Sequence, residues 1–409
     1  MNVPKPTLGR ALAEAADKAD ELAQFRNEFV FGEENVIYLD GNSLGRLTKK
    51  GRAQILKTAD QEWGSGLIRS WGESWLSLPR TVGDKIAKLI GAKESEVLVS
   101  DSTSVNLFKL ATAALKLRSR KVILTVADNF PSDLYILKGV GDLQIMPNIE
   151  ALLDNLNEET AIVSLAHTCY KTGRIHDMRL ITEAAHKAGA FVIWDISHSV
   201  GVIPLQLDNC FVDMAVGCTY KYLNGGPGSP AFLFVREEMI AHMENPIQGW
   251  FSHADPFQFK QEFEAAAGIE RFLTGTPPIL SMAALEPALD LILEAGIDRL
   301  RKKSFLLTEY VIALAHERLT KYGVEVVSPA EAGQRGSHVS FMHADAWQLS
   351  QALIEHGVVP DFREPNILRI GLAPIYTSFV EVYDAITMLE NILANKLHSN
   401  YSVARSGVS

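Results

Sequence analysis

The sequence predicts an α/β protein whose large domain is built on a mainly parallel, doubly wound sheet. Short apolar runs with the length and β-branched content of buried strands recur between about residues 95 and 235, and helical patterns separate them. Such alternation is typical of a parallel sheet with helices on both faces. We expect strands at 97–99, 121–126, 161–166, 191–196, 212–218 and 231–235, and helices at 79–94, 105–117, 150–157 and 178–188.

The segments on either side predict two further parts. Residues 8–29 have the pattern of an amphipathic helix, 36–39 that of a short strand, and 49–78 that of a helical stretch interrupted by glycines. After a helix at 279–296 the pattern changes to a compact α+β set, with helices at 301–321, 346–356 and 378–395 and strands at 324–327, 338–342, 358–362 and 368–370. We therefore divide the chain into an N-terminal segment (1–65) that packs with the small domain, a large domain (66–296) and a small C-terminal α+β domain (297–409).

Composition narrows the class of protein. The chain has 409 residues, 47% of them hydrophobic and 22% charged, as in ordinary globular proteins. A net charge of −10 argues against a nucleic-acid partner, and no apolar stretch is long enough to span a membrane. Residues 1–25 show no signal peptide, and the spacing of Cys169, Cys210 and Cys218 fits neither a disulfide framework nor a metal site. We expect a cytoplasmic protein without a bound metal or a membrane partner.

Asp195 and Lys221 are the central candidates for chemistry. Each follows a predicted buried strand, and ligands of open α/β sheets bind beyond the carboxyl ends of strands. A pyridoxal phosphate (PLP) enzyme needs a lysine amine to bond the cofactor aldehyde and a carboxylate to hold the pyridine nitrogen protonated. Taken alone, the pair is better explained by an aspartate in a turn and a solvent-exposed lysine. Whether the pair forms a PLP site therefore depends on the other motifs of the chain.

Three further stretches suit such a ligand. The run of residues 100–104 holds four hydroxyls and opens a helix, which favours phosphate, although a simple N-cap needs only one of them. Phe130 follows a strand and could stack on a planar ring. Residues 63–75 carry half of the six tryptophans, either as core or as an aromatic wall. No G-x-G-x-x-G or Walker loop lies at a strand-to-helix turn, which disfavours dinucleotides and nucleoside triphosphates.

Eight strings in chain order between residues 38 and 278 resemble the kynureninase family, which belongs to the fold-type I PLP enzymes of the class V aminotransferase superfamily. The resemblance continues to about residue 376. The Asp-x-x-His and Tyr-Lys-Tyr strings recur across the superfamily, whereas the strings at 104–109, 129–133 and 249–251 are more specific to the family. The strings are YLDGNSLG (38–45), WG…LIRSW (63–71), SVNLFK (104–109), NFPSD (129–133), WDISHSVG (194–201), YKYLNGGPG (220–228), GWF (249–251) and GTPP (275–278).

The resemblance implies a PLP-dependent homodimer that hydrolyses kynurenine. It implies that Lys221 bonds the cofactor, that Asp195 pairs with the ring nitrogen, and that Tyr220 both holds the phosphate and takes part in catalysis. The other cofactor-binding residues it implies are Thr103, Ser104, Phe130, Pro131, Ser132, Asp133 and His198, with Trp250 and Thr276 from the neighbouring subunit. The substrate-binding residues it implies are Ser43, Trp63, Gly275 and Arg369, the last as a clamp for the α-carboxylate. The Gly275-Thr276 pair resembles the bacterial pattern that prefers kynurenine to its 3-hydroxy form.

The residues by themselves leave three other functions open. A cysteine desulfurase of the same superfamily needs a mobile nucleophilic cysteine, for which Cys169 is a candidate. An aminotransferase would share Asp195 and Lys221 without needing the tryptophans. A cofactor-binding regulator without turnover is a third alternative. The sequence also does not decide whether Thr168 replaces a polar contact missing at Ala166.

Overall fold

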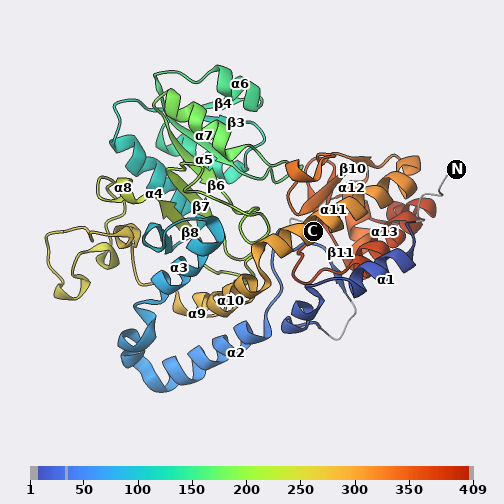
Figure 1. Cartoon of the computed structure of the whole chain (residues 1–409), viewed down its shortest axis with the longest axis horizontal. Coiled ribbons are helices and arrows are strands. Elements are labelled where there is room, and N and C mark those ends of the chain that lie inside the picture. The colour runs from blue at the N-terminus through green and yellow to red at the C-terminus, as the bar shows by residue number, and fades with distance from the viewer. Residues whose placement is uncertain (1–7, 33–35, 405–409) are drawn as a thin grey trace.

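The computed structural model describes residues 8–32 and 36–404. A large body surrounds the central sheet, and a smaller one holds the C-terminal elements together with α1 (Arg10–Lys18) (Figure 1). Within the described residues, no helix has both the length and the apolar character that a membrane span requires.

The central sheet has seven strands in the order β2-β8-β7-β6-β5-β3-β4. Only β8 runs antiparallel to its neighbours, β2 and β7, and the remaining pairs are parallel. The prediction of a mainly parallel sheet is therefore confirmed. The strands are β2 (Val97–Val99), β3 (Val122–Val126), β4 (Asp142–Met146), β5 (Thr160–Ala166), β6 (Phe191–Asp195), β7 (Met214–Gly217) and β8 (Phe232–Val235).

Helices cover both faces of this sheet. Neighbouring strand residues point to opposite faces, so Val163 and Trp194 join one apolar core while Ile162 and Ile193 join another. The first core also receives α3 (Leu78–Ile90), α7 (Met178–Lys187) and α10 (Leu285–Ala295), and the second receives α4 (Thr103–Lys116) and α5 (Pro131–Val140). The remaining helices here are α2 (Lys49–Lys57), α6 (Ile149–Asp154), α8 (Glu237–Ile240) and α9 (Ile279–Met282).

The smaller body has its own apolar core and an antiparallel sheet of order β12-β13-β10-β9. Its elements are α11 (Ile297–Arg318), β9 (Glu325–Val326), β10 (His338–Met342), α12 (Ala346–Glu355), β11 (Val358–Val359), β12 (Asp361–Arg363), β13 (Ile367–Gly371) and α13 (Phe379–Ala394). Ala13 of α1 and Leu39 belong to this core, and β1 (Ile37–Tyr38) pairs with β11. Phe25 and Phe29 instead join a core of the large body. The domain boundaries at 65/66 and 296/297 stay predictions.

Several predicted elements differ from those observed. The helix expected at 8–29 breaks after Lys18, where the Asp20 side chain accepts a hydrogen bond from the Leu22 N–H, and a short 3₁₀ segment follows at 23–28. The stretch at 49–78 is α2 followed by π-helical and 3₁₀ turns. The helix expected at 279–296 is α9 and α10, and Pro360 separates β11 from β12.

The helices α5 and α8 and the strand β4 were not predicted. Pro131 stands at the first position of α5, where its fixed φ suits a helix start and its missing N–H costs nothing. Strand β4 lies at the sheet edge and is half exposed, so its sequence lacks the apolar run of a central strand.

Candidate active site

A cavity of about 380 Å³ lies at the carboxyl ends of the central strands. Polar turns after β2, β3, β6 and β7 converge there, as expected for an open α/β sheet. Its volume is in the range of sites that hold cofactors. The sequence-predicted residues that line it are Thr103, Ser104, Phe130, Ser132, Asp133, Asp195, His198, Tyr220 and Lys221.

The amine of Lys221 points into this cavity beside a neutral imidazole. Its Nζ lies 3.2 Å from His198 Nε2 and 6.0 Å from the centre of the Phe130 ring. Burial and then the charge of Lys221 hold the pKa of His198 well below its usual range. The amine therefore has no cationic partner at His198.

The loop of Lys221 is fixed by the YLDGNSLG segment. The Gly45 N–H donates to the Tyr220 carbonyl at 2.8 Å. A Cβ at Gly45 would collide with the Lys221 carbonyl and the Asn224 side chain, so the close approach requires glycine. Two of the strings that carried the resemblance are thus neighbours in space.

Two carboxyl groups face the same cavity with different surroundings. Asp195 ends β6 and accepts the Ser197 N–H at 2.8 Å. Asp133, in the first turn of α5, is buried, and burial together with the charge of Asp195 raises its pKa well above the usual range. Burial therefore favours the neutral form of Asp133.

The first turn of α4 forms a site for an anion. Ser102 caps the helix by accepting the Val105 N–H at 3.3 Å, and Thr103 and Ser104 are its first two residues. Gly228 and Ser229 line the cavity with them. Hydroxyls and free N–H groups at the N-terminus of a 14-residue helix suit a phosphate.

Arg369 and Ser43 lie together but are not among the residues that line this cavity. The guanidinium of Arg369 is fully buried, forms an ion pair with Asp361, and donates to the Tyr170 carbonyl at 2.5 Å and to Ser43 Oγ at 3.2 Å. Because Tyr170 does line the cavity, Arg369 lies directly behind its wall.

Five other predicted residues do not line the cavity. Trp63 lines a separate apolar hollow of about 430 Å³ with Trp71, Trp75, Pro277 and Pro278. Trp250, Gly275 and Thr276 are not among the lining residues of the cavity either. Pro131 contributes by starting α5 rather than by lining the cavity.

The cavity also has lining residues that the sequence did not reveal. Tyr170 packs edge-on against Phe130 with ring centres 5.2 Å apart, and Asp101, Ser197 and Ser229 complete the wall. The position of Tyr170 in a loop after β5 was the one available signal. At that loop Ala166 lines the cavity, whereas the Thr168 hydroxyl lies 2.8 Å from Ser199 Oγ and is buried.

The cavity joins groups that match the three functional parts of PLP. An amine, carboxyl groups and a hydroxyl-rich helix start line it, and these are the kinds of group that bind the aldehyde, the ring nitrogen and the phosphate of PLP. The fold is similar to that of a cysteine desulfurase from Thermococcus onnurineus NA1 (TM-score 0.77, 19% identity, covering 93% of this chain and 98% of that one). It is also similar to a C-DES variant with glycine covalently linked to its PLP cofactor (TM-score 0.80, 18% identity, covering 90% and 99%). The chain therefore has the fold of these two proteins, one of which binds PLP, and its cavity has side chains suited to that cofactor.

Sequence relatives narrow this class to one family. The chain is 44% identical over 395 residues to a kynureninase from Pseudomonas fluorescens, covering 93% of this chain and 95% of that protein. It is 43% identical over 397 residues to a kynureninase from Burkholderia mallei, covering 94% and 95%. Residues 300–389 match the family model described as the kynureninase C-terminal domain. The chain belongs to the kynureninase family.

Proposed function

We propose that this enzyme uses PLP to hydrolyse L-kynurenine to anthranilate and L-alanine, with 3-hydroxykynurenine as a second substrate. The observation that carries the proposal is the Lys221 amine, 3.2 Å from a neutral His198, in one cavity with Asp195 and the start of α4. Membership of the kynureninase family supplies the choice of substrate.

Bound PLP supplies an aldehyde that condenses with amines and a ring that accepts electrons. Lys221 would bond the cofactor aldehyde and, when its amine is free, would take the α-proton as a base. Asp195 would hold the ring nitrogen protonated, and Phe130 would stack on the ring. Thr103, Ser104 and Tyr220 would hold the phosphate.

Hydrolysis adds one water to the γ-carbonyl carbon of kynurenine and breaks the β–γ bond. The carboxyl product leaves as anthranilate, and the β-carbon gains a proton to become the methyl group of alanine. Tyr220 lines the same cavity, and we assign to its hydroxyl the donation of that proton. Arg369 and Ser43 hold the substrate α-carboxylate, because a guanidinium fork matches that group in geometry and charge.

We also propose a homodimer in which Trp250 and Thr276 reach the cofactor phosphate of the partner, and Trp63 and Gly275 line the aromatic side of a site. Trp250, Phe257 and Phe259 form an exposed aromatic group, and Trp63 is 57% exposed. Figure 1 shows α2 and the yellow segment between β8 and α9 projecting from the large body. Exposed apolar projections of this kind are typical of subunit interfaces.

None of the three cysteines suits the nucleophilic role that a cysteine desulfurase requires. Cys169 and Cys218 are buried, Cys210 is half-buried, and burial raises the pKa of all three thiols, against the need for a reactive thiolate. These free thiols support a cytoplasmic location as part of the proposal, which fractionation of cells would test.

A turnover assay tests the function. The purified protein is given PLP and then L-kynurenine or 3-hydroxykynurenine in separate reactions, and anthranilate or 3-hydroxyanthranilate is followed by fluorescence. We expect release of both products, faster from kynurenine, and none from the Lys221→Ala variant. PLP binding without release of either product would contradict the proposed reaction and leave the fold class unaffected.

A further inference from the structure

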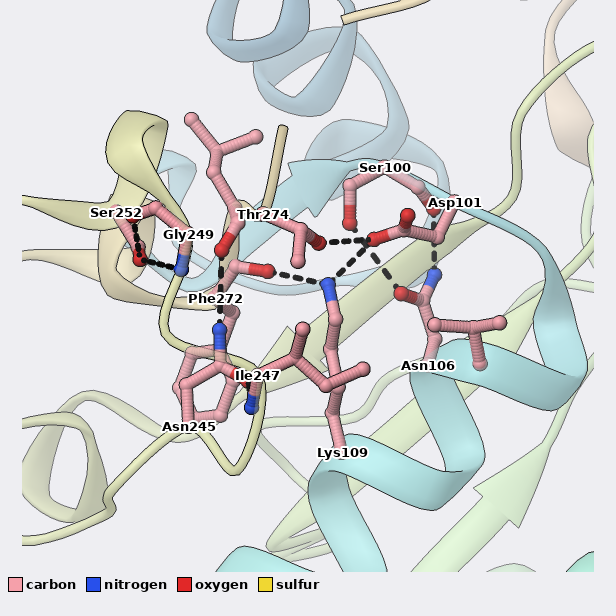
Figure 2. A network of polar contacts seen from close by, with 12 residues as sticks. Ser100, Asp101, Asn106, Lys109, Asn245, Ile247, Gly249, Ser252, Phe272 and Thr274 are labelled. Atoms are coloured by element: carbon pink, nitrogen blue, oxygen red, sulfur yellow. Dashed lines mark hydrogen bonds and ion pairs between the residues drawn. The ribbon is translucent and has the colours of Figure 1, made fainter. Parts of the chain in front are cut away.

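Lys109 of α4 is a fully buried lysine that the proposed chemistry does not use. Its Nζ forms an ion pair with the Asp101 carboxylate and donates to the Phe272 carbonyl at 2.6 Å. The Thr274 hydroxyl donates to the same Asp101 oxygen at 2.9 Å. Figure 2 shows Lys109 reaching from α4 to the space between Asp101 and Phe272. Two segments that are far apart in the sequence, residues 101–109 and residues 272–274, therefore meet at one carboxylate.

Asp101 sets the direction of the turn that leads into α4. Its φ is +48°, a left-handed conformation that aspartate tolerates better than most residues. Its carbonyl accepts the Ala231 N–H at 2.8 Å, and the Asn106 side chain donates to the Ser100 carbonyl at 2.8 Å. The position of Thr103 and Ser104 at the cavity depends on this turn.

Asp101 also places a negative charge at the wall of a cavity built for an anion. Its side chain lines the cavity and is 29% exposed, whereas the ammonium of Lys109 is wholly buried. An uncompensated carboxylate beside a phosphate would repel it, and the repulsion would be stronger here than in water because the site is partly desolvated. The ammonium group behind Asp101 removes this repulsion.

The same network holds the segment that carries Trp250. The Phe251 N–H donates to the Thr274 carbonyl at 3.2 Å. A Cβ at Gly249 would collide with that carbonyl. The backbone at 249 and the backbone at 274 are therefore too close for any residue other than glycine at position 249. Fixing Phe272 and Thr274 therefore also fixes Trp250.

We propose that Lys109 is a positioning residue for the cofactor phosphate, which neutralises Asp101 and ties the turn at 101–104 to the segment at 245–276. The inference rests on the proposed PLP-dependent function and deepens it. It predicts that Lys109 controls affinity for the phosphate group and has no influence on the bond between Lys221 and the aldehyde.

Affinity measurements on the apo-protein separate these contributions. Binding of PLP and of pyridoxal, which lacks the phosphate, is followed by quenching of tryptophan fluorescence. We expect Lys109→Met to weaken PLP binding by about tenfold or more and to leave pyridoxal binding unchanged, because one partner of a buried ion pair is left alone. The double variant Lys109→Met/Asp101→Asn removes both charges and is expected to recover most of the PLP affinity.

Lys116 provides a matched control. It lies on the same helix and pairs with Glu244 at 3.3 Å, but both side chains are at least half exposed. Lys116→Met is expected to bind both ligands as the wild type does. Thr274→Val, which removes one donor to Asp101 with little change in volume, is expected to weaken PLP binding by about threefold.

Each outcome decides a different point. Unchanged PLP affinity of Lys109→Met, or an equal loss for pyridoxal, would overturn the inference. If Lys109→Met does not fold, the PLP affinity of Thr274→Val tests the inference instead. Unchanged PLP affinity in that variant overturns the inference. Failure of the wild-type protein to bind PLP would instead overturn the proposed function on which the inference rests.

Discussion

Asp133 lines the same cavity as Asp195, and its surroundings favour the neutral form of its carboxyl group. Burial and then the charge of Asp195 raise the pKa of Asp133 well above its usual range. We therefore expect Asp133→Asn, which copies a neutral acid, to keep kcat/KM within about tenfold of the wild type. Asp195→Asn removes the charge that holds the ring nitrogen protonated and is expected to cost about 100-fold or more.

Steady-state kinetics with L-kynurenine measure both variants, and circular dichroism checks their folds. Equal losses in the two variants would contradict the assignment of the proton to Asp133.

Arg369 stands behind the cavity wall, and its predicted role depends on the shape of its head group. Arg369→Lys keeps a positive charge beside Asp361, so the buried carboxylate still has an ionic partner. The substitution removes the planar guanidinium group, which can donate two parallel hydrogen bonds. We expect KM for kynurenine to rise by about tenfold, with a smaller change in kcat.

Arg363 provides the comparison, since it also pairs with Asp361, at 2.9 Å, while its side chain is 35% exposed. If Arg363→Lys raised KM and Arg369→Lys did not, the α-carboxylate clamp would have to be reassigned to Arg363.

The pairing of α7 with the sheet depends on a titratable group. His186 of α7 lies 2.8 Å from Asp213, whose same oxygen accepts the Val192 N–H of β6 at 2.8 Å. The hydrogen bond to Asp213 raises the pKa of His186. A histidine with a raised folded-state pKa stabilises the fold fully below its unfolded pKa, and this contribution is lost as the pH rises through the folded pKa.

We therefore expect His186→Gln to lower Tm more at pH 5.5 than at pH 8.5. The pair is partly exposed and is worth at most about 1 kcal/mol, or about 1–2 °C in a chain of this size. His316→Gln, at an exposed position on α11, is expected to give the same Tm difference at both pH values. A deficit for His186→Gln that does not change with pH would contradict the charged pairing.

The sequence was informative about elements that obey one strong local rule. Central strands such as β5 are buried on both faces, so they appear as continuous apolar runs and were predicted almost to the residue. Strand β4 at the edge lacks that pattern, and α5 was hidden because its polar first turn had the composition of a loop. The turns after Lys57 were also not predictable, since their geometry follows from tertiary packing rather than from periodicity.

At the scale of the whole molecule, the sequence predicted those residues of the candidate site that lie at the carboxyl edge of the central sheet. Asp195, Lys221 and the start of α4 all follow strands, so the topology alone brings them together. Asp361 escaped notice because its contact with Arg369 lies in the smaller body and follows no local pattern. Tyr170 escaped notice although its loop follows β5, because nothing in the loop sequence singles it out. The predicted roles of Trp63, Trp250, Gly275 and Thr276 require a second subunit, and they stay predictions.

Mixing of two inactive variants tests whether subunits share their sites. In a dimer of a Lys221→Ala subunit with a Trp250→Ala/Thr276→Ala subunit, one site receives Lys221 from the second subunit and Trp250 and Thr276 from the first. That site has all three native residues, while the other site of the same dimer lacks Lys221, Trp250 and Thr276. If the subunits exchange freely, half of the dimers are mixed, and the mixture is expected to recover about a quarter of wild-type activity.

The control mixes Lys221→Ala with Lys221→Arg, which share one lesion and are expected to stay inactive in every combination. Recovery requires Trp250 and Thr276 to act on the partner's site, because residues that served their own site would leave each mixed dimer with two defective centres. A mixture that stays inactive although sedimentation shows subunit exchange would therefore place Trp250 and Thr276 in the site of their own chain, or in none.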